Sequence, residues 1–229
     1  MQYPGINSKE KKEKLNTYSR MIFDYNKKFN LTGLKTIEEI ENILIAGSLL
    51  PFSAINVPRG TLIADIGTGA GIPGIPLGIM LDSAVFTLID STRKKIQFIN
   101  EVINKLGIDN ISTACERAEE LGRDIILRET FDWVTTRAMA DPYMASELGA
   151  PLLKTGGYLY LYASDKQSEL SSVTINHISD LGLTELKDDA KLDVLKTSCG
   201  GMLFTKLSST DTRYPRRIKA IKRDSENAG

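Results

Sequence analysis

Apolar residues recur along this chain at two different spacings, and the change of spacing divides the sequence into two parts. In the first part they return every three or four positions, which is the period of a helix with one buried face. The clearest set is Leu15, Tyr18, Met21, Ile22 and Tyr25. This pattern predicts helices over about residues 9–28 and 37–51, and hence an N-terminal helical extension over residues 1–56.

From residue 57 onwards, short runs of β-branched and aromatic residues alternate with helical segments. Strands are predicted over residues 61–66, 85–90, 111–114, 131–136 and 158–162, with weaker ones near 183–186 and 202–207. The clearest helix runs from Arg93 to Leu106 and ends at Gly107. Because such alternation builds a mostly parallel sheet with helices on both faces, we expect an α/β core over residues 57–210 with a seven-stranded sheet.

Basic residues are concentrated near the two ends of the chain, although the net charge is zero. They are Lys9, Lys11, Lys12 and Lys14 near the start, and Arg213, Arg216, Arg217, Lys219, Lys222 and Arg223 in a basic tail over residues 211–229. These residues are either RNA-facing patches or solvated termini. The last segment, residues 224–229, is expected to be frayed.

The composition excludes several classes of protein. A chain of 229 residues suffices for one sizeable α/β domain, and no apolar run is long enough to cross a bilayer. The N-terminus lacks the apolar core of a secretory signal, so we expect a cytoplasmic protein. We also expect it to be a monomer. Cys115 and Cys199 form no metal-binding pattern and are expected to be buried thiols, and His177 is expected on a surface helix. We therefore expect neither a metal site nor catalysis by histidine.

A glycine-rich loop follows the first predicted strand and precedes a helix. It reads Asp65-Ile66-Gly67-Thr68-Gly69-Ala70-Gly71-Ile72-Pro73-Gly74. Glycines allow a positive φ and let the backbone approach a ligand closely, while the free amides of the next helix can donate to that ligand. The loop predicts a bound ligand, and a purely structural tight turn is the alternative.

Two carboxylates beside this loop favour S-adenosylmethionine as the ligand. Methyltransferases of this fold usually read D/E-x-G-x-G-x-G, and Asp65 supplies the acid, which either orders the loop or holds the cofactor's ammonium group through water. Asp90 ends the next strand, where a carboxylate can accept both ribose hydroxyls. Dinucleotide enzymes share that acid, but Pro73 departs from their G-x-G-x-x-G loop. The pattern is typical of a Rossmann-like, class I S-adenosylmethionine-dependent methyltransferase.

Several segments of the chain resemble one family in particular. They are Asn30-Leu31-Thr32-Gly33-Leu34, the glycine loop with its continuation to Pro76, Phe86–Ile99, Phe131–Ala138 and Tyr214-Pro215-Arg216-Arg217. Together they are similar, over most of the chain, to the small-subunit ribosomal RNA (guanine-N7) methyltransferases, also called the glucose-inhibited division protein B family. The resemblance implies S-adenosylmethionine as cofactor, and small-subunit rRNA or a ribosomal particle as partner.

The resemblance and the loop pattern together assign the site residues. By position, the resemblance implies that Gly67, Ile72, Ala118, Glu119 and Arg137 line the cofactor site, beside Asp65, Gly69, Gly71 and Asp90. Glu119 could instead be a solvated helix cap. Arg137 is also the candidate catalytic residue, because it ends the fourth strand and could position the cofactor carboxylate or an RNA phosphate. The alternative for Arg137 is a surface arginine that caps its strand.

Two segments depart from the family pattern. Its R-H-x-x-D-S stretch reads Ile43–Ser48 here and keeps only the serine, and the Lys-Gly pair expected after the fifth strand reads Tyr162–Lys166. The alternative function is therefore a cofactor-binding protein with a different substrate or a non-catalytic regulatory role. RNA is favoured if Lys27, Lys28, Lys35 and the C-terminal arginines surround the cofactor mouth.

One short segment suggests a different methyl acceptor. Asp141-Pro142-Tyr143 resembles the D/N-P-P-Y/F element of amino-group methyltransferases, but one proline is missing, and a helix N-cap explains the sequence without chemistry. Guanine N7 has a free lone pair at neutral pH, so its methylation requires no general base. Such a reaction fits a chain with one histidine and no evident acid–base pair.

Overall fold

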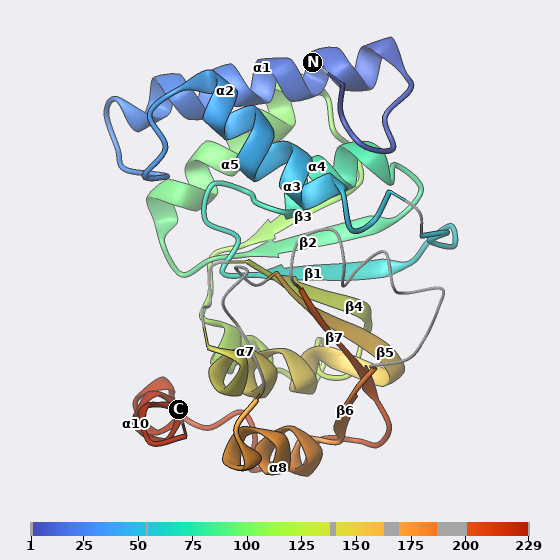
Figure 1. Ribbon diagram of the computed structural model, residues 1–229, viewed down its shortest axis with the longest axis vertical. Coiled ribbons are helices and arrows are strands. Elements are labelled where there is room, and N and C mark those ends of the chain that lie inside the picture. Colours follow the sequence, from blue (N-terminus) through green and yellow to red (C-terminus); the bar gives the residue numbers. More distant parts are fainter. Residues whose placement is uncertain (1, 54, 138–140, 163–169, 187–200, 229) are drawn as a thin grey trace.

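The computed structural model in Figure 1 describes residues 2–53, 55–137, 141–162, 170–186 and 201–228. Its centre is a seven-stranded sheet in the order β3-β2-β1-β4-β5-β7-β6. The strands are β1 Leu62–Ile66, β2 Val85–Ile89, β3 Ile111–Ala114, β4 Phe131–Thr136, β5 Leu153–Leu161, β6 Leu183–Glu185 and β7 Met202–Lys206. β1 to β5 are parallel, and β7 pairs antiparallel with both β5 and β6. The predicted mostly parallel sheet of seven strands is confirmed.

Helices cover both faces of this sheet (Figure 1). One face carries α1 Lys9–Asn26, α2 Ile37–Glu39, η1 Ile40–Ala46, α3 Gly47–Leu49, α4 Gly74–Met80 and α5 Arg93–Leu106. The other face carries α6 Ala118–Leu121, α7 Pro142–Gly149, η2 Ala150–Leu152, α8 Ser172–Asp180 and α10 Ile218–Glu226. Successive side chains of a strand point to opposite faces of the sheet, so the core has two parts. In β1, Ile63 packs with the first set of helices and Ala64 with the second.

The N-terminal helices share a core with the sheet. Leu15, Tyr18 and Ile22 of α1 are fully buried, and they belong to the same apolar cluster as Phe86 of β2 and Trp133 of β4. Since an amphipathic helix is stabilised mainly by the packing of its apolar face, α1 depends on the sheet that it covers. This packing places α1 directly over the loop that follows β1.

Two elements differ from the predicted ones. The second N-terminal helix extends over residues 37–49, but its central turns, Ile40–Ala46, are π-helical. β5 begins at Leu153, five residues before the predicted strand. The observed strand includes Gly156 and Gly157, and its register with β4 shifts in this region. A side chain at Gly157 would lie 2.9 Å from the carbonyl of Asp132, so glycine here permits close strand approach and does not end the strand.

The C-terminal segment is ordered rather than frayed. Residues 218–226 form α10, in which Ile221 is fully buried, and Ala228 is 4% exposed. The prediction of a frayed end at residues 224–228 is therefore wrong, because the apolar face of α10 packs against α7. Among the described helices, none has the length and apolar character needed to span a membrane.

Candidate cofactor site

The glycine loop lies where β1 ends, at the carboxyl edge of the parallel strands (Figure 1). Gly67, Gly69 and Gly71 all have positive φ, at 68°, 62° and 93°. At Gly71 a side chain is also excluded by space, because a Cβ atom would lie 2.5 Å from Ile75. Glycine is therefore required at Gly71 by both backbone conformation and packing.

Asp65 lies beneath this loop and is fully buried. Its Oδ2 atom accepts hydrogen bonds from the Thr68 hydroxyl at 2.6 Å and from the backbone amide of Gly74 at 2.9 Å. Burial raises the pKa of Asp65 to about 7, although the bonds from Thr68 and Gly74 oppose that rise. These contacts show that Asp65 orders the loop, while a water-mediated contact with the cofactor's ammonium group stays a prediction.

Asp90 follows β2 and is connected to the same loop. Its Oδ2 accepts from the amide of Gly69 at 3.0 Å and from Lys95 Nζ at 3.3 Å, and its Oδ1 accepts from the amide of Thr92 at 2.8 Å. Only 6% of Asp90 is exposed. The carboxylate is thus held at the end of its strand by two backbone amides and by Lys95, while its contact with the ribose hydroxyls stays a prediction.

Two cavities lie on either side of the glycine loop. The first, of about 270 Å³, is bordered by Gly67, Asp90, Lys95, Ala118, Glu119, Leu148 and Ile218 among others. The second, of about 220 Å³, is bordered by Leu31, Thr32, Leu44, Thr68, Gly69, Ala70, Ile72 and Arg137. The predicted site residues are therefore divided into two groups, with Asp65 and Gly71 supporting the loop between them.

Glu119 borders the first cavity and is 6% exposed. It lies in the short helix α6, whose N-cap is Arg117. A buried carboxylate that borders a cavity does not fit the alternative of a solvated helix cap. Its contact with an adenine ring stays a prediction.

Arg137 borders the second cavity, and its guanidinium group faces the N-terminal helices. Nη1 donates to the Leu44 carbonyl at 2.7 Å and to the Ser48 hydroxyl at 2.9 Å, and Nη2 donates to the Ile43 carbonyl. The guanidinium group also lies 5.6 Å from the centre of the Tyr162 ring. Arg137 therefore joins β4 to the π-helix η1, and its contact with a cofactor carboxylate or a phosphate stays a prediction.

Sequence patterns missed the partners of Arg137. Ser48, the serine kept from the family's R-H-x-x-D-S stretch, donates to the Leu44 carbonyl and accepts from Arg137. The Tyr162 hydroxyl in turn donates to the Ser48 carbonyl at 2.7 Å. The retained serine was the signal that could have indicated this contact. The second departure, at Tyr162–Lys166, lies outside the described residues beyond Tyr162.

Asp141 caps α7, as the helix-cap interpretation predicted. Its side chain accepts from the amide of Tyr143, and Pro142 takes the first helical position. His177 lies on the surface helix α8, as predicted, but on its buried face: it is 6% exposed and stacks on the Tyr143 ring with centroids 3.7 Å apart, because α8 packs against α7. The prediction of a buried Cys115 was wrong, because Cys115 is exposed, and Cys199 lies outside the described residues.

The C-terminal Tyr-Pro-Arg segment joins the same buried cluster. Arg216 donates to both carboxylate oxygens of Glu147, with Nη2 at 2.7 Å from Oε2, and Nη1 lies 2.7 Å from Asp224 Oδ2. Burial alone would raise the pKa of Glu147, but His177 and Arg216 beside it lower that pKa to about 2. Arg216 is thus an internal anchor of the C-terminal segment and not an RNA-facing residue.

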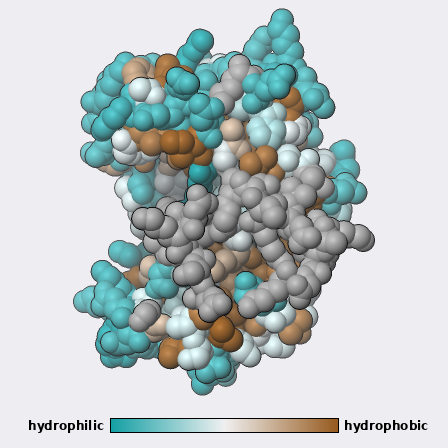
Figure 2. All heavy atoms as spheres, viewed as in Figure 1, coloured by the Kyte–Doolittle hydropathy of each residue, from teal (hydrophilic) through white to brown (hydrophobic). Residues whose placement is uncertain are grey.

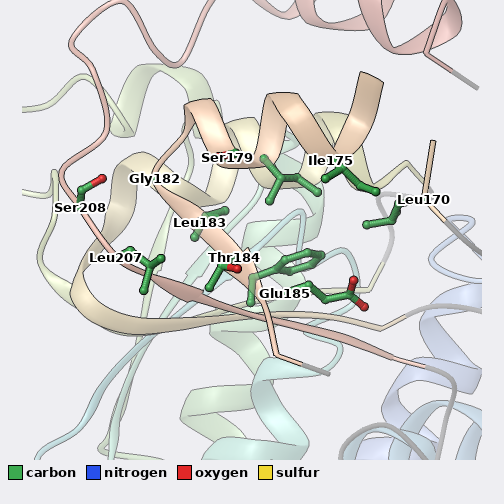
Figure 3. Close-up of a pocket in the computed structure, with 11 residues that line it drawn as sticks. Leu170, Ile175, Ser179, Gly182, Leu183, Thr184, Glu185, Leu207 and Ser208 are labelled. Carbon is green, nitrogen blue, oxygen red and sulfur yellow. The ribbon is translucent and has the colours of Figure 1, made fainter. Parts of the chain in front are cut away.

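A larger cavity, of about 480 Å³, lies elsewhere in the fold. Figure 3 shows it between α8 and strands β6 and β7, lined by side chains such as Ile175, Leu183 and Leu207. It contains none of the residues that the glycine-loop pattern assigned. The chemistry of the residues beside the glycine loop, and not the size of the cavity, therefore indicates the cofactor site.

Exposed basic residues lie on two sides of the loop site. Lys27, Lys28 and Lys35 are exposed in and beside the α1–α2 connection, whose Leu31 and Thr32 border the second cavity. Lys219, Lys222 and Arg223 are exposed on α10, as is its N-cap Arg217, and Ile218 of this helix borders the first cavity. The hydrophilic surface over both segments is visible in Figure 2. These basic residues therefore flank the site from two ends.

Comparison with known proteins identifies relatives over most of the chain. The sequence profile described as "rRNA small subunit methyltransferase G" matches residues 11–186. A protein of Desulfitobacterium hafniense called ribosomal RNA small subunit methyltransferase G is 37% identical, covering 90% of this chain and 85% of its own. A protein of the same name from Clostridium perfringens strain 13 is 34% identical, covering 92% and 88%.

Solved structures share the fold at low identity. A SAM-dependent methyltransferase from Aquifex aeolicus has a TM-score of 0.51 and 15% identity, covering 84% of this chain and 98% of its own. The cyclase SpnF has the same TM-score and 13% identity, covering 71% and 80%. The Rossmann-like methyltransferase fold is thus confirmed. Because this fold also occurs in a cyclase, the reaction must be argued from the site and the family.

Proposed function

This chain belongs to the rRNA small subunit methyltransferase G family, and from that premise we propose that it methylates N7 of a guanine in small-subunit rRNA. It is an S-adenosylmethionine-dependent rRNA methyltransferase. The family and the shared fold leave open which atom is methylated and where the cofactor lies. The lining of the two cavities supports an answer to both.

The first cavity suits the nucleoside end of the cofactor. Two backbone amides hold the Asp90 carboxylate at the end of β2, and its other two acceptor positions, one of which now accepts from Lys95, would bind the ribose hydroxyls. Ala118 and Glu119 border the same cavity beyond it. Its volume of about 270 Å³ lies just below the range of roughly 300 to 1,000 Å³ for whole small-molecule sites, and only the nucleoside end of the cofactor would occupy it. The residues present therefore fit S-adenosylmethionine.

The single observation that carries the proposal is the composition of the second cavity. Among the described residues that border it, Arg137 alone carries a charge, and none is a carboxylate, a histidine or a lysine. Among these described residues, a guanine docked there would meet no general base. N7 needs none because its lone pair is free, whereas an amino group or a hydroxyl would have to lose a proton. The composition of this cavity therefore favours a ring nitrogen as the methyl acceptor.

The glycine loop would align the two reactants. Bound S-adenosylmethionine supplies an electrophilic methyl group on a sulfonium. Gly67 borders the first cavity and Gly69 the second, so the two cavities meet at the loop. Holding the acceptor nitrogen in line behind the methyl group can supply on the order of 7 to 11 kcal/mol of barrier reduction. The chain's contribution is therefore mainly orientation, by a loop that Asp65 keeps rigid.

The alternative is a non-catalytic cofactor-binding protein, suggested by the altered Ile43–Ser48 stretch. The structure gives that stretch a defined partner, because Arg137 donates to its carbonyls and to Ser48. Membership of the methyltransferase family favours the enzyme. The proposal retains the expectation of a cytoplasmic monomer that acts on small-subunit rRNA, either free or within a ribosomal particle.

Transfer of a radiolabelled methyl group tests the proposal. Small-subunit particles and naked rRNA would be prepared from a strain that lacks its own enzyme, and each incubated with labelled S-adenosylmethionine. We expect label in at least one substrate, and its loss in Asp90→Ala. Cofactor binding without label in either substrate would contradict the rRNA activity and favour the alternative.

A further inference from the structure

Helix α10 borders the first cavity, although it lies far along the chain from the glycine loop. Ile218, its first residue, is half-buried and borders the 270 Å³ cavity together with Asp90, Glu119 and Leu148. We propose that Ile218 and Leu148 form an apolar wall against the adenine ring of the cofactor, so that α10 is part of the cofactor site. This inference rests on the proposed function, since it assumes that the first cavity receives the nucleoside.

The position of α10 is fixed by the ion pair that precedes it. Arg216 lies two residues before Ile218, and its partner Glu147 lies next to Leu148 on α7. The backbone amide of Arg216 also donates to Glu147, at 2.8 Å. Both wall residues are therefore adjacent to one bidentate, charge-assisted contact, which holds their separation more rigidly than apolar packing alone would.

A second contact ties the same segment to the helix on the other side of the cavity. Arg123 follows α6, which carries Ala118 and Glu119, and its Nε donates to the Pro215 carbonyl at 3.0 Å. The apolar face of α10 adds Ile221, which is fully buried against α7. The three helices that border the cavity, α6, α7 and α10, are thus connected to one another.

The chemistry of this wall suits a purine face. Leu148 and Ile218 are branched aliphatic side chains, which pack against a flat aromatic ring without requiring a hydrogen bond. The polar side chains that border the same cavity include Asp90 and Glu119, which would bind edge groups of the nucleoside. Ile218 is therefore a specificity residue for the nucleoside end, and it would have no contact with the amino-acid end of the cofactor.

The test compares Ile218→Ala with Ile175→Ala, which makes the same substitution at the unrelated cavity beside α8. Isothermal titration calorimetry would measure binding of S-adenosylhomocysteine and of 5′-methylthioadenosine, which lacks the amino-acid end. We expect Ile218→Ala to weaken both ligands by the same factor, about five- to tenfold. Ile175→Ala should leave both affinities unchanged.

Melting temperatures would be recorded for each variant, and Ile218→Thr, which keeps the β-branched shape, gives a second measurement if the alanine variant is unstable. Unchanged affinity for both ligands in the Ile218 variants would overturn the inference. A loss confined to S-adenosylhomocysteine would also overturn it, because the contact would then lie at the amino-acid end. Failure of the wild-type protein to bind either ligand would instead count against the proposed function.

Discussion

A carboxylate that solvent does not reach lies beneath the glycine loop. Asp65 is fully buried, its pKa is raised to about 7 mainly by desolvation, and it accepts from Thr68 and Gly74. In the unfolded chain its pKa is the ordinary 3.8. The folded protein therefore holds this proton more tightly than the unfolded chain does. The contribution of the protonated Asp65 to the free energy of unfolding is complete below the unfolded pKa, and it is lost as the pH rises through the folded pKa.

Asp65→Asn removes this titration while keeping an amide oxygen for the Thr68 and Gly74 donors. We expect the free energy of unfolding of the wild type, minus that of Asp65→Asn, to fall by roughly 2 to 3 kcal/mol between about pH 5 and pH 8. Urea denaturation of both proteins across this range measures the difference. A difference that does not change with pH would show that Asp65 is already ionised in the folded protein at pH 5.

Local spacing made some site residues predictable and left others hidden. Asp90 could be placed from sequence because strand, loop and acid are close along the chain, and the structure connects it to Gly69. Arg137 could be placed at the end of β4, but its partners lie about 90 residues away in Ile43–Ser48, so no local pattern reveals them. Ile218 carries no motif at all, because only tertiary packing brings it to the cavity.

At the scale of elements, α1 supports the glycine loop directly. The buried hydroxyl of Tyr18 donates to the Ala70 carbonyl at 2.7 Å, and it would lie 3.2 Å from any Cβ atom added at Gly71. The helix is therefore a support for the cofactor loop as well as a cover for the sheet. Removing the Tyr18 hydroxyl should therefore reduce both the stability of the protein and its affinity for the cofactor.

In Tyr18→Phe the Ala70 carbonyl loses this donor in a buried position. We expect the free energy of unfolding to fall by about 1 to 3 kcal/mol and the affinity for S-adenosylmethionine to fall with it. Denaturation and calorimetry measure the two effects. Tyr3→Phe is the matched control, because the Tyr3 hydroxyl donates to the Asn16 side chain, away from the loop. Equal effects of the two variants on cofactor affinity would contradict a special role for Tyr18.

The sequence patterns predicted most elements, and the exceptions have physical causes. The alternation of strands and helices follows from apolar periodicity, which reports burial on two faces. The early start of β5 was missed because glycine weakens a strand pattern even where close backbone approach requires it. α10 was taken for a tail because its many charged residues concealed the single apolar face formed by Ile218 and Ile221.

For the whole molecule, the two basic segments lie at opposite ends of the edge that carries the cofactor site. RNA that reaches the second cavity could contact the α1–α2 connection on one side and α10 on the other (Figure 1). Phosphate contacts by lysine or arginine release counterions, so binding weakens with salt in proportion to their number. Both segments should therefore contribute to the salt dependence of RNA binding.

Two double variants test this arrangement, Lys28→Ala with Lys35→Ala and Lys219→Ala with Lys222→Ala. We expect each pair to weaken rRNA binding and to lower the slope of log K against log salt by about 1 to 2, with unchanged cofactor affinity. Arg59→Ala is the control, because Arg59 is exposed before β1, at the opposite edge of the sheet. If only one pair changed the slope, RNA would bind on one side of the site alone.

The chemical identity of the methylated nucleoside tests the proposed reaction most directly. Small-subunit rRNA would be methylated by the protein, digested to nucleosides and analysed by mass spectrometry, with Asp90→Ala as the inactive control. We predict N7-methylguanosine as the one new methylated nucleoside, absent with Asp90→Ala. A methyl group on an exocyclic amine or a ribose hydroxyl would contradict the proposal, since the described lining of the second cavity offers no base to take up the proton.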